Sequence, residues 1–280
     1  MVLISTSGSF GRYITMDATT TIWLRAALAA VLLFAFCLVR GYSLRIHNRK
    51  DLLAITAGAI LLGAHWVFYF ISLQMTNVAI GMLTLFTFPL FATLLEPVFY
   101  KTGWSAKQLF ACFMVLVGLY ILIPSTDLNG SYVNGILLGL LSALCFTLRN
   151  LVLKPQTNIY NGSVIMAYQL AIMAVVMIPL QLEADLSQTI DFIWPLLFLA
   201  LFTTVIGHTM FLGSFRNFSI ATASILASLQ PVYGIIIALI FLGEVPTLNS
   251  VIGGALILGT VVFTSLDLTK KRDKAEASSR

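Results

Sequence analysis

The sequence predicts an all-α integral membrane protein, with ten transmembrane helices arranged as two inverted five-helix repeats and a shortened first helix. Three observations lead to this fold class. Only 10% of the 280 residues are charged and 59% are hydrophobic, whereas an average soluble domain has about 25% charged residues. Long stretches contain no charge at all, the longest being 52–95. The Lys and Arg residues also fall on one side of the predicted membrane. This composition excludes a soluble globular enzyme.

The uncharged stretches are predicted to be helices because backbone in lipid must satisfy its own hydrogen bonds, in helices or in closed barrels. Barrel strands alternate apolar and polar residues, but the stretch 234–243 is continuously apolar. A helix needs about 20 residues to cross the hydrocarbon core, so each stretch holds one or two spans. In chain order the expected spans are 1–15, 20–39, 52–73, 77–100, 108–124, 135–153, 162–182, 192–214, 219–243 and 249–267.

The connections between these spans are short, and some carry turn-forming residues, as at 124–130, Lys154-Pro155 and Asn161-Gly162. They leave no room for a second, soluble domain. The expected organisation is therefore one five-helix repeat at 1–124, a second at 135–267, and a charged cytoplasmic tail at 268–280.

The distribution of positive charge predicts the orientation. If the even-numbered loops and the C-terminus share one side, that side holds 14 of the 16 Lys and Arg residues and leaves only Arg12 and Arg25 for the other. A miscounted span would destroy this asymmetry. Both termini are therefore expected in the cytoplasm, and the protein in the plasma (inner) membrane.

The two halves are weakly similar at an offset of 142 residues. Residues 78–89 (VAIGMLTLFTFP) correspond to 220–231 (IATASILASLQP), so that Pro89 pairs with Pro231. Five spans per half place the second half in the opposite orientation, which is a recurrent design of transporters. The same offset shows that the first span lacks roughly its first eight residues. We expect either an N-terminus missing from the sequence or a short first helix.

A resemblance to a known family rests on the five-plus-five spans, the two prolines and the segment 242–254 (LGEVPTLNSVIGG). Together these resemble the EamA-like branch of the drug/metabolite transporter superfamily, over nearly the whole chain. The first half departs from the pattern, because KTGW at 101–104 replaces the Gly-Glu motif. The resemblance implies a secondary transporter, often an exporter of amino acids or other small metabolites.

Polar and aromatic residues inside the spans are the candidate substrate-binding residues. His65 and Tyr69 share a helix face at a spacing of four residues, and Trp66 is the repeat counterpart of His208. Such groups line pockets for small amphipathic solutes. The proposed set is His65, Trp66, Tyr69, Phe88, Thr204, His208 and Gln230. The alternative is that these side chains only pack and bond between helices.

The two histidines are candidate proton carriers, because histidine titrates near physiological pH and an ionisable group at membrane depth often serves function. The alternative is a neutral histidine that bonds to a neighbouring backbone carbonyl.

Four residues are candidate hinges or gates. Pro89 and Pro231 fall inside spans, where proline removes a helical hydrogen bond; the alternative is a static kink. Glu96 and Arg149 are expected near the inner ends of their spans, where they would form a latch; the alternative is an isolated acid at the interface. Arg25 is expected to extend toward lipid phosphates, with binding of a substrate carboxylate as the alternative.

The sequence thus favours a secondary active transporter of a small, amino-acid-like or amphipathic solute, an exporter working by alternating access, with or without proton coupling. It is not expected to be an enzyme, to hold a metal or cofactor, or to bind nucleic acid. The alternatives are a non-transporting receptor or assembly factor, and an intramembrane enzyme. Glycines suited to close helix contact, within one subunit or between the two of a homodimer, are Gly135, Gly139, Gly253, Gly254 and Gly259.

Overall fold

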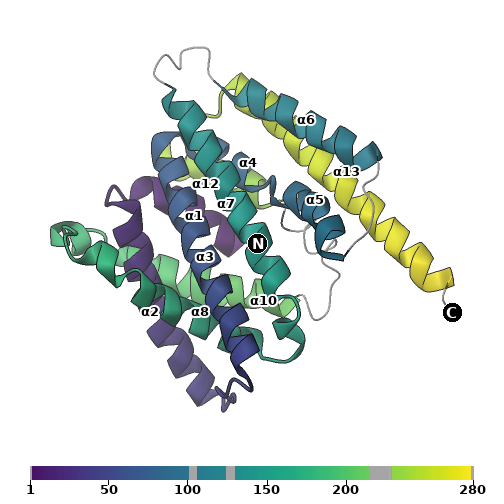
Figure 1. Ribbon diagram of the computed structural model, residues 1–280. Helices are drawn as coiled ribbons and strands as arrows, with labels where there is room; N and C mark the ends of the chain where they lie inside the picture. The colour runs from purple at the N-terminus through teal and green to yellow at the C-terminus, as the bar shows by residue number, and fades with distance from the viewer. Residues whose placement is uncertain (1, 101–105, 124–129, 215–226, 228, 279–280) are drawn as a thin grey trace.

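The computed structural model describes residues 2–100, 106–123, 130–214, 227 and 229–278, and every regular element in these residues is a helix (Figure 1). The all-α class is thereby confirmed. The first half contains α1 (Val2–Tyr13), α2 (Ala18–Val39), α3 (Arg49–Met75), α4 (Val78–Leu85), α5 (Phe88–Tyr100) and α6 (Ala106–Leu122).

The second half begins with α7 (Ser131–Leu153), and α8 (Gly162–Val176) follows it. Short 3₁₀ turns (Gln156–Asn158, Ile178–Gln181 and Ser187–Thr189) lie before and after α8. The chain continues through α9 (Ile193–Phe198), the π-helix η4 (Leu199–His208), α10 (Thr209–Ser214), α12 (Gln230–Leu242) and α13 (Leu248–Ser278).

Local sequence explains where several helices begin and end. The side chains of Asp17, Asn48, Asn77 and Asn161 accept hydrogen bonds from free backbone N–H groups at the starts of α2, α3, α4 and α8. Gly243 adopts a left-handed conformation, with φ of +68°, and ends α12.

Helix α3 lies at the centre of the packing. It runs along α7 and also contacts α8, α2 and α1, and it buries Leu62, Phe70 and Leu73 completely. Around it, α2 packs against α8, and α1 packs against α12. Helices α6 and α13 lie side by side along one edge of the bundle (Figure 1).

Glycines bring several of these helices into close contact. A Cβ atom at Gly139 would collide with Thr84 Oγ1, and one at Gly253 would lie 2.7 Å from the carbonyl oxygen of Gly118. The expected tight packing is therefore confirmed for both positions. Gly259 is different, because nothing lies within 4 Å of a Cβ atom there.

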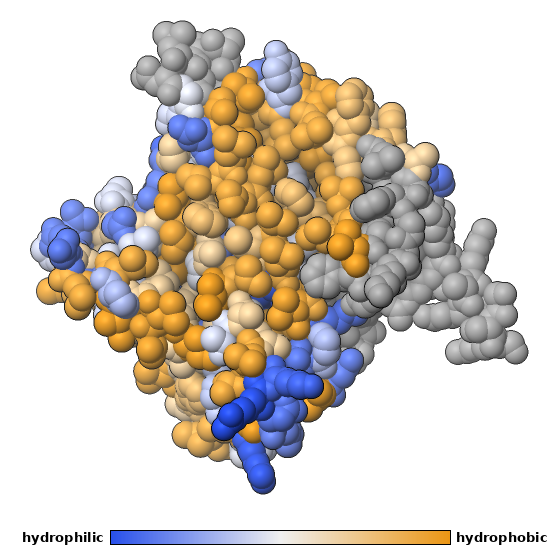
Figure 2. Space-filling model, in the orientation of Figure 1, coloured by the Kyte–Doolittle hydropathy of each residue, from blue (hydrophilic) through white to orange (hydrophobic). Residues whose placement is uncertain are grey.

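The outer surface of the bundle is apolar. Val39, Phe110, Tyr120 and Phe241 are all more than half exposed, and Figure 2 shows hydrophobic residues over most of the visible face. Among the described residues, four helices are long and apolar enough to cross a bilayer: Ala18–Val39, Arg49–Met75, Ser131–Leu153 and Ile193–Phe211. Several shorter apolar helices accompany them. This surface fits a hydrocarbon solvent.

Two expected spans are interrupted. The span 77–100 breaks at Phe86 and Thr87, where the Thr87 hydroxyl donates a 2.7 Å hydrogen bond to the carbonyl oxygen of Thr84. The span 192–214 contains the π-helix η4. Most of the first part of the expected span 219–243 lies outside the described residues. The count of ten complete spans therefore stays a prediction.

Candidate functional site

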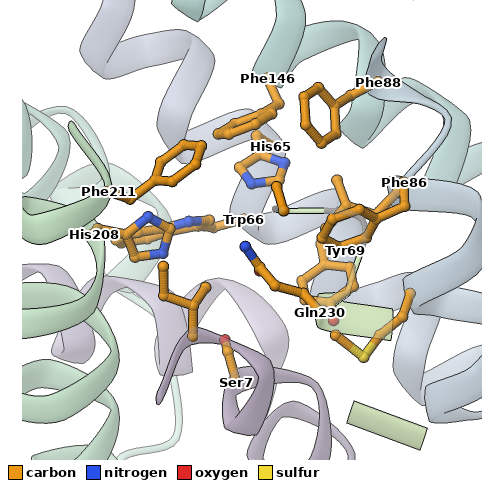
Figure 3. A pocket seen from close by; sticks show the side chains of 14 residues that line it. Ser7, His65, Trp66, Tyr69, Phe86, Phe88, Phe146, His208, Phe211 and Gln230 are labelled. Carbon is orange, nitrogen blue, oxygen red and sulfur yellow. The ribbon is translucent and has the colours of Figure 1, made fainter. Parts of the chain in front are cut away.

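A cavity of about 50 Å³ lies inside the bundle, and six of the seven predicted substrate-binding residues line it (Figure 3). A volume of this size holds only a few water molecules, so the cavity is narrow in this conformation. The lining residues come from both halves of the chain: Ile4, Ser7, His65, Trp66, Tyr69, Met82, Leu85, Phe86, Phe88, Phe146, His208, Phe211, Ala227 and Gln230.

His65 is fixed by α7. Its Nδ1 atom lies 2.7 Å from Ser142 Oγ and 3.2 Å from the Ser142 carbonyl oxygen, while the Ser142 hydroxyl donates to the His65 carbonyl at 2.9 Å. Because that hydroxyl proton is already used, Nδ1–H is the donor to Ser142. The arrangement matches the alternative of a histidine bonded to a neighbouring backbone carbonyl. The other ring nitrogen, Nε2, takes no part in the contact with Ser142.

His208 stands in a different environment. It ends η4, and its ring centroid lies 5.5 Å from that of Trp66. Figure 3 shows the His208 ring beside Trp66 at one side of the cavity, facing the Gln230 amide. A ring contact with Trp66 thus positions His208, whereas hydrogen bonds with Ser142 position His65.

Aromatic rings form the remaining wall. Phe146 lies 4.8 Å from His65 and 5.0 Å from Phe88, centroid to centroid, and Phe88 lies 5.7 Å from Phe86. Tyr69 stacks against His65 at 6.4 Å. The cavity therefore offers ring faces and edges for a flat apolar group.

Thr204, the seventh predicted residue, does not line the cavity. It is fully buried and accepts a 2.8 Å hydrogen bond from Arg25 Nε. Arg25 also donates to Ser7 Oγ at 3.3 Å and to Thr203 Oγ1 at 3.2 Å, and its guanidinium lies 3.9 Å from the Trp66 ring centroid. Thr204 thus lies outside the cavity wall, in contact with Arg25.

The expectation that Arg25 extends to lipid phosphates is wrong. Its side chain is only 1% exposed, because the hydroxyl groups of α1 and η4 and the Trp66 ring surround the guanidinium. These partners lie on other helices, so the sequence of the span that contains Arg25 does not indicate them.

Both predicted hinge prolines lie in the first turn of a helix. Pro89 is the second residue of α5 and Pro231 the second residue of α12. At that position the missing N–H is not needed within the helix. In the first half the helix breaks before the proline, at Phe86 and Thr87, rather than bending at it.

Arg149 is buried and 1% exposed, like Arg25. Its Nη atoms donate to Gln169 Oε1 at 2.7 Å and to Asn150 Oδ1 at 3.1 Å, while its Nε has no hydrogen-bond partner. The predicted latch to Glu96 stays a prediction, because the Glu96 side chain lies outside the described residues.

An ion pair joins the two halves at the ends of helices that line the cavity. Arg12 Nε lies 3.0 Å from Glu244 Oε1, and Arg12 Nη1 donates to the Gln74 carbonyl at 2.8 Å. Glu244 Oε2 accepts from the Val78 backbone N–H at 2.9 Å. Glu244, placed just after α12, thereby ties together the ends of α1 and α3 and the start of α4.

Several lining residues were not predicted, but the internal repeat contains a signal for them. Adding 142 to Ile4, Trp66, Tyr69, Leu85 and Phe88 gives Phe146, His208, Phe211, Ala227 and Gln230, and all ten line the cavity. The repeat offset, applied to the predicted residue Tyr69, gives Phe211, whereas Ile4 and Phe146 are counterparts of each other and neither was a candidate. Ser7, Met82 and Phe86 carry no such signal.

Comparison with known proteins decides the family. The model of the EamA-like transporter family matches residues 1–123 and 133–266. The chain belongs to the EamA-like transporter family. Its curated relatives are likewise named transporters, so this EamA-like protein is an integral, multi-pass membrane transporter.

Two relatives and one solved structure align with almost all of this EamA-like chain. The uncharacterized transporter YxxF of Bacillus subtilis (strain 168) is 26% identical over 287 residues, covering 100% of this chain and 90% of that one. An uncharacterized transporter of Archaeoglobus fulgidus is 27% identical over 265 residues, covering 94% and 92%. A crystal structure superposes with a TM-score of 0.69 at 17% identity, covering 96% and 94%, and shows the same fold.

Proposed function

We propose that the protein is a secondary transporter that exports a small amphipathic solute by alternating access. In this proposal two inverted five-helix repeats, 1–124 and 135–267, hold the solute between them. The observation that carries the proposal is the composition of the cavity wall, to which both halves contribute residues at equivalent repeat positions. A site between two repeats remains in place while the repeats move relative to each other.

The helix packing supports the two-fold relation. Equivalent helices pack on each other, as α2 does on α8 and α6 on α13. Other contacts occur in exchanged pairs: α3 on α7 corresponds to α1 on η4, and α1 on α12 corresponds to α7 on α5. An internal two-fold axis in the membrane plane generates this pattern.

The Arg12–Glu244 pair is the proposed outer gate, because it ties the end of α1 to the residue just after α12, and both helices contribute residues to the cavity wall. Opening this side requires the pair to separate. The break at Phe86 and Thr87 and the π-helix η4 border the cavity and interrupt regular helical hydrogen bonding, so they are the proposed hinges. Pro89 and Pro231 stabilise the helix starts beside them.

We propose His208 as the group that couples transport to protons. Two hydrogen bonds join Ser142 to His65, one with the ring nitrogen Nδ1 and one with the backbone carbonyl. His208, in contrast, is positioned at the cavity wall by an aromatic ring contact. The charge asymmetry of the loops supports an orientation with both termini in the cytoplasm and a location in the plasma (inner) membrane.

Access to the cavity from each side tests alternating access without knowledge of the solute. Cys37, Cys112 and Cys145 are first replaced by Ala, and Ser7→Cys then places one thiol in the cavity wall. We expect a charged, membrane-impermeant thiol reagent to label it from the inner side, and from the outer side once Glu244→Gln breaks the gate. Labelling from one side only, in both backgrounds, contradicts the mechanism.

A cross-link tests whether the gate must open during transport. Arg12→Cys and Glu244→Cys are combined in the same cysteine-free background and bridged by a short, reducible bifunctional thiol reagent. Counterflow into proteoliposomes is measured for a panel of radiolabelled amino acids, 2-oxo acids and aromatic acids. The bridge should abolish counterflow and reduction should restore it, while each single cysteine variant stays active. Undiminished counterflow by the bridged protein contradicts the gate, and no counterflow of any panel member by the unmodified protein contradicts transport.

A further inference from the structure

We propose that the cavity binds a monocarboxylate anion with an aromatic body, and that the buried guanidinium of Arg25 supplies its countercharge. This inference rests on the proposed function and names the substrate class of the same site. It distinguishes a carboxylate anion from a zwitterionic amino acid and from a cation.

The first argument is the uncompensated charge of Arg25. Its three hydrogen-bond acceptors are the neutral hydroxyl oxygens of Ser7, Thr203 and Thr204. Within the described part of the chain the one salt bridge is Arg12–Glu244. A buried cation without a carboxylate is costly, especially at membrane depth. A ligand anion that enters the cavity removes this cost, which makes anion binding favourable.

The second argument is the position of Ser7 between Arg25 and the cavity. Ser7 lines the cavity, and its Oγ accepts the longest of the three Arg25 hydrogen bonds, at 3.3 Å. Since Oγ is the acceptor in this contact, the hydroxyl proton points to another group. A carboxylate at Ser7 therefore receives the hydroxyl proton and lies next to the guanidinium. Figure 3 shows Ser7 at the edge of the cavity, below the Gln230 amide.

The third argument is a second buried positive charge, on a helix that contributes to the cavity wall. Arg149 lies one helical turn beyond the lining residue Phe146, and its buried Nε has no hydrogen-bond partner. Arg25, which contacts Ser7, and Arg149, which follows Phe146 on α7, thus place two buried cations next to residues of the cavity wall, in a region of low dielectric constant where they attract an anion more strongly than in water.

The lining determines the rest of the ligand. None of the fourteen lining residues is Asp or Glu, so the ammonium group of an amino acid finds no countercharge in the wall. The rings of Trp66, Tyr69, Phe88 and Phe146 offer contacts to an aromatic group. These features favour an aromatic acid without an amino group.

Three compounds with the same phenyl ring separate the charge classes: phenylpyruvate as the anion, L-phenylalanine as the zwitterion and phenethylamine as the cation. Binding to the purified full chain in detergent is measured by calorimetry. We expect saturable binding of phenylpyruvate, at least about tenfold tighter than that of phenylalanine, because hydrogen bonds to a charged group contribute more than neutral ones. Tighter binding of either other compound, or no saturable binding of phenylpyruvate, overturns the proposal.

Variants then test the role of Arg25. Arg25→Gln should weaken phenylpyruvate binding about 10- to 100-fold, and Arg25→Lys, which keeps the charge, should weaken it less. Arg45→Gln, in an exposed loop, is the matched control and should bind like the wild type. Equal affinity of a folded Arg25→Gln variant and the wild type overturns the assignment. If Arg25→Gln does not fold, Ser7→Ala is the second variant, and unchanged affinity there overturns it.

Failure of this inference is distinguishable from failure of the proposed function. Counterflow of a zwitterion or a cation, but of no carboxylate, refutes the anion site and leaves the transporter intact. Saturable phenylpyruvate binding without counterflow of any solute supports the anion site and refutes transport.

Discussion

Asp17 shows how a single residue outside the membrane contributes to a helix inside it. Partial burial acts to raise the pKa of its carboxyl group, but hydrogen bonds from Thr19 and Thr20 outweigh burial and hold this pKa below its usual value. The group therefore stabilises the fold above the unfolded pKa of about 3.9. This contribution is lost as the pH falls through the lower folded pKa.

Replacing Asp17 by Ala should lower stability at neutral pH by about 1 kcal/mol, the usual cost of losing a helix cap. The difference from the wild type should shrink as the pH falls below 4, because a protonated aspartate no longer accepts strongly from the backbone. Equilibrium unfolding in mixed micelles across this pH range measures both effects. A difference that grows toward acid pH contradicts the assignment.

The two histidines of the cavity should respond differently to the same substitution. His65→Gln breaks the paired hydrogen bonds with Ser142, so we expect a loss of about 1 kcal/mol in stability. His208→Gln should leave stability nearly unchanged and abolish the response of transport to an imposed pH gradient. Thermal unfolding and counterflow with and without the gradient measure these outcomes. Equal sensitivity of both variants to the gradient contradicts the separate roles.

At the scale of helices, the contact between α6 and α13 depends on the absence of side chains at two glycines. A Cβ atom at Gly253 would collide with the backbone of Gly118. Unlike a side chain, this backbone cannot move aside by changing its rotamer. Gly253→Ala must therefore push the two helices apart, whereas Gly259→Ala on the same helix enters open space.

We expect Gly253→Ala to lower stability by about 1–3 kcal/mol, as overpacking does. Gly259→Ala should be neutral or slightly stabilising, because Ala favours a helix more than Gly does. Equal unfolding temperatures of the two variants contradict the close contact.

The helix breaks show which features of the helices the sequence predicts and which it does not. The prolines at 89 and 231 are visible in the sequence, and the residue before each of them, Phe88 and Gln230, lines the cavity. A proline disfavours the helical conformation of the residue before it, but this restriction does not determine at which residue the preceding helix ends. The break falls at Phe86 and Thr87 because the Thr84 carbonyl accepts from the Thr87 side chain, a choice that depends on local packing.

For the whole molecule, the topology is the property most open to test. Single cysteines at Arg45 and Thr157, in the cysteine-free background, should react with an impermeant thiol reagent only from the cytoplasmic side. A cysteine at Gln188 should react only from the outside. Labelling of whole cells before and after permeabilisation measures this. Arg45 and Thr157 on opposite sides would falsify the inverted topology, because the charge asymmetry would then be accidental.

The sequence by itself predicted that this protein lies in lipid, that it is helical, and which residues make up six of the fourteen positions of its cavity wall. These follow from hydrophobic length, loop charge and an internal repeat, each of which is a property of one segment or of a fixed offset. Only the tertiary structure decided that Arg25 points inward, that Glu244 ties Arg12 to α4, and that Ser142 holds His65. Each of these depends on a partner more than 10 residues away in the chain, on another helix or beyond its end, and periodicity within one helix carries no information about which neighbour faces it.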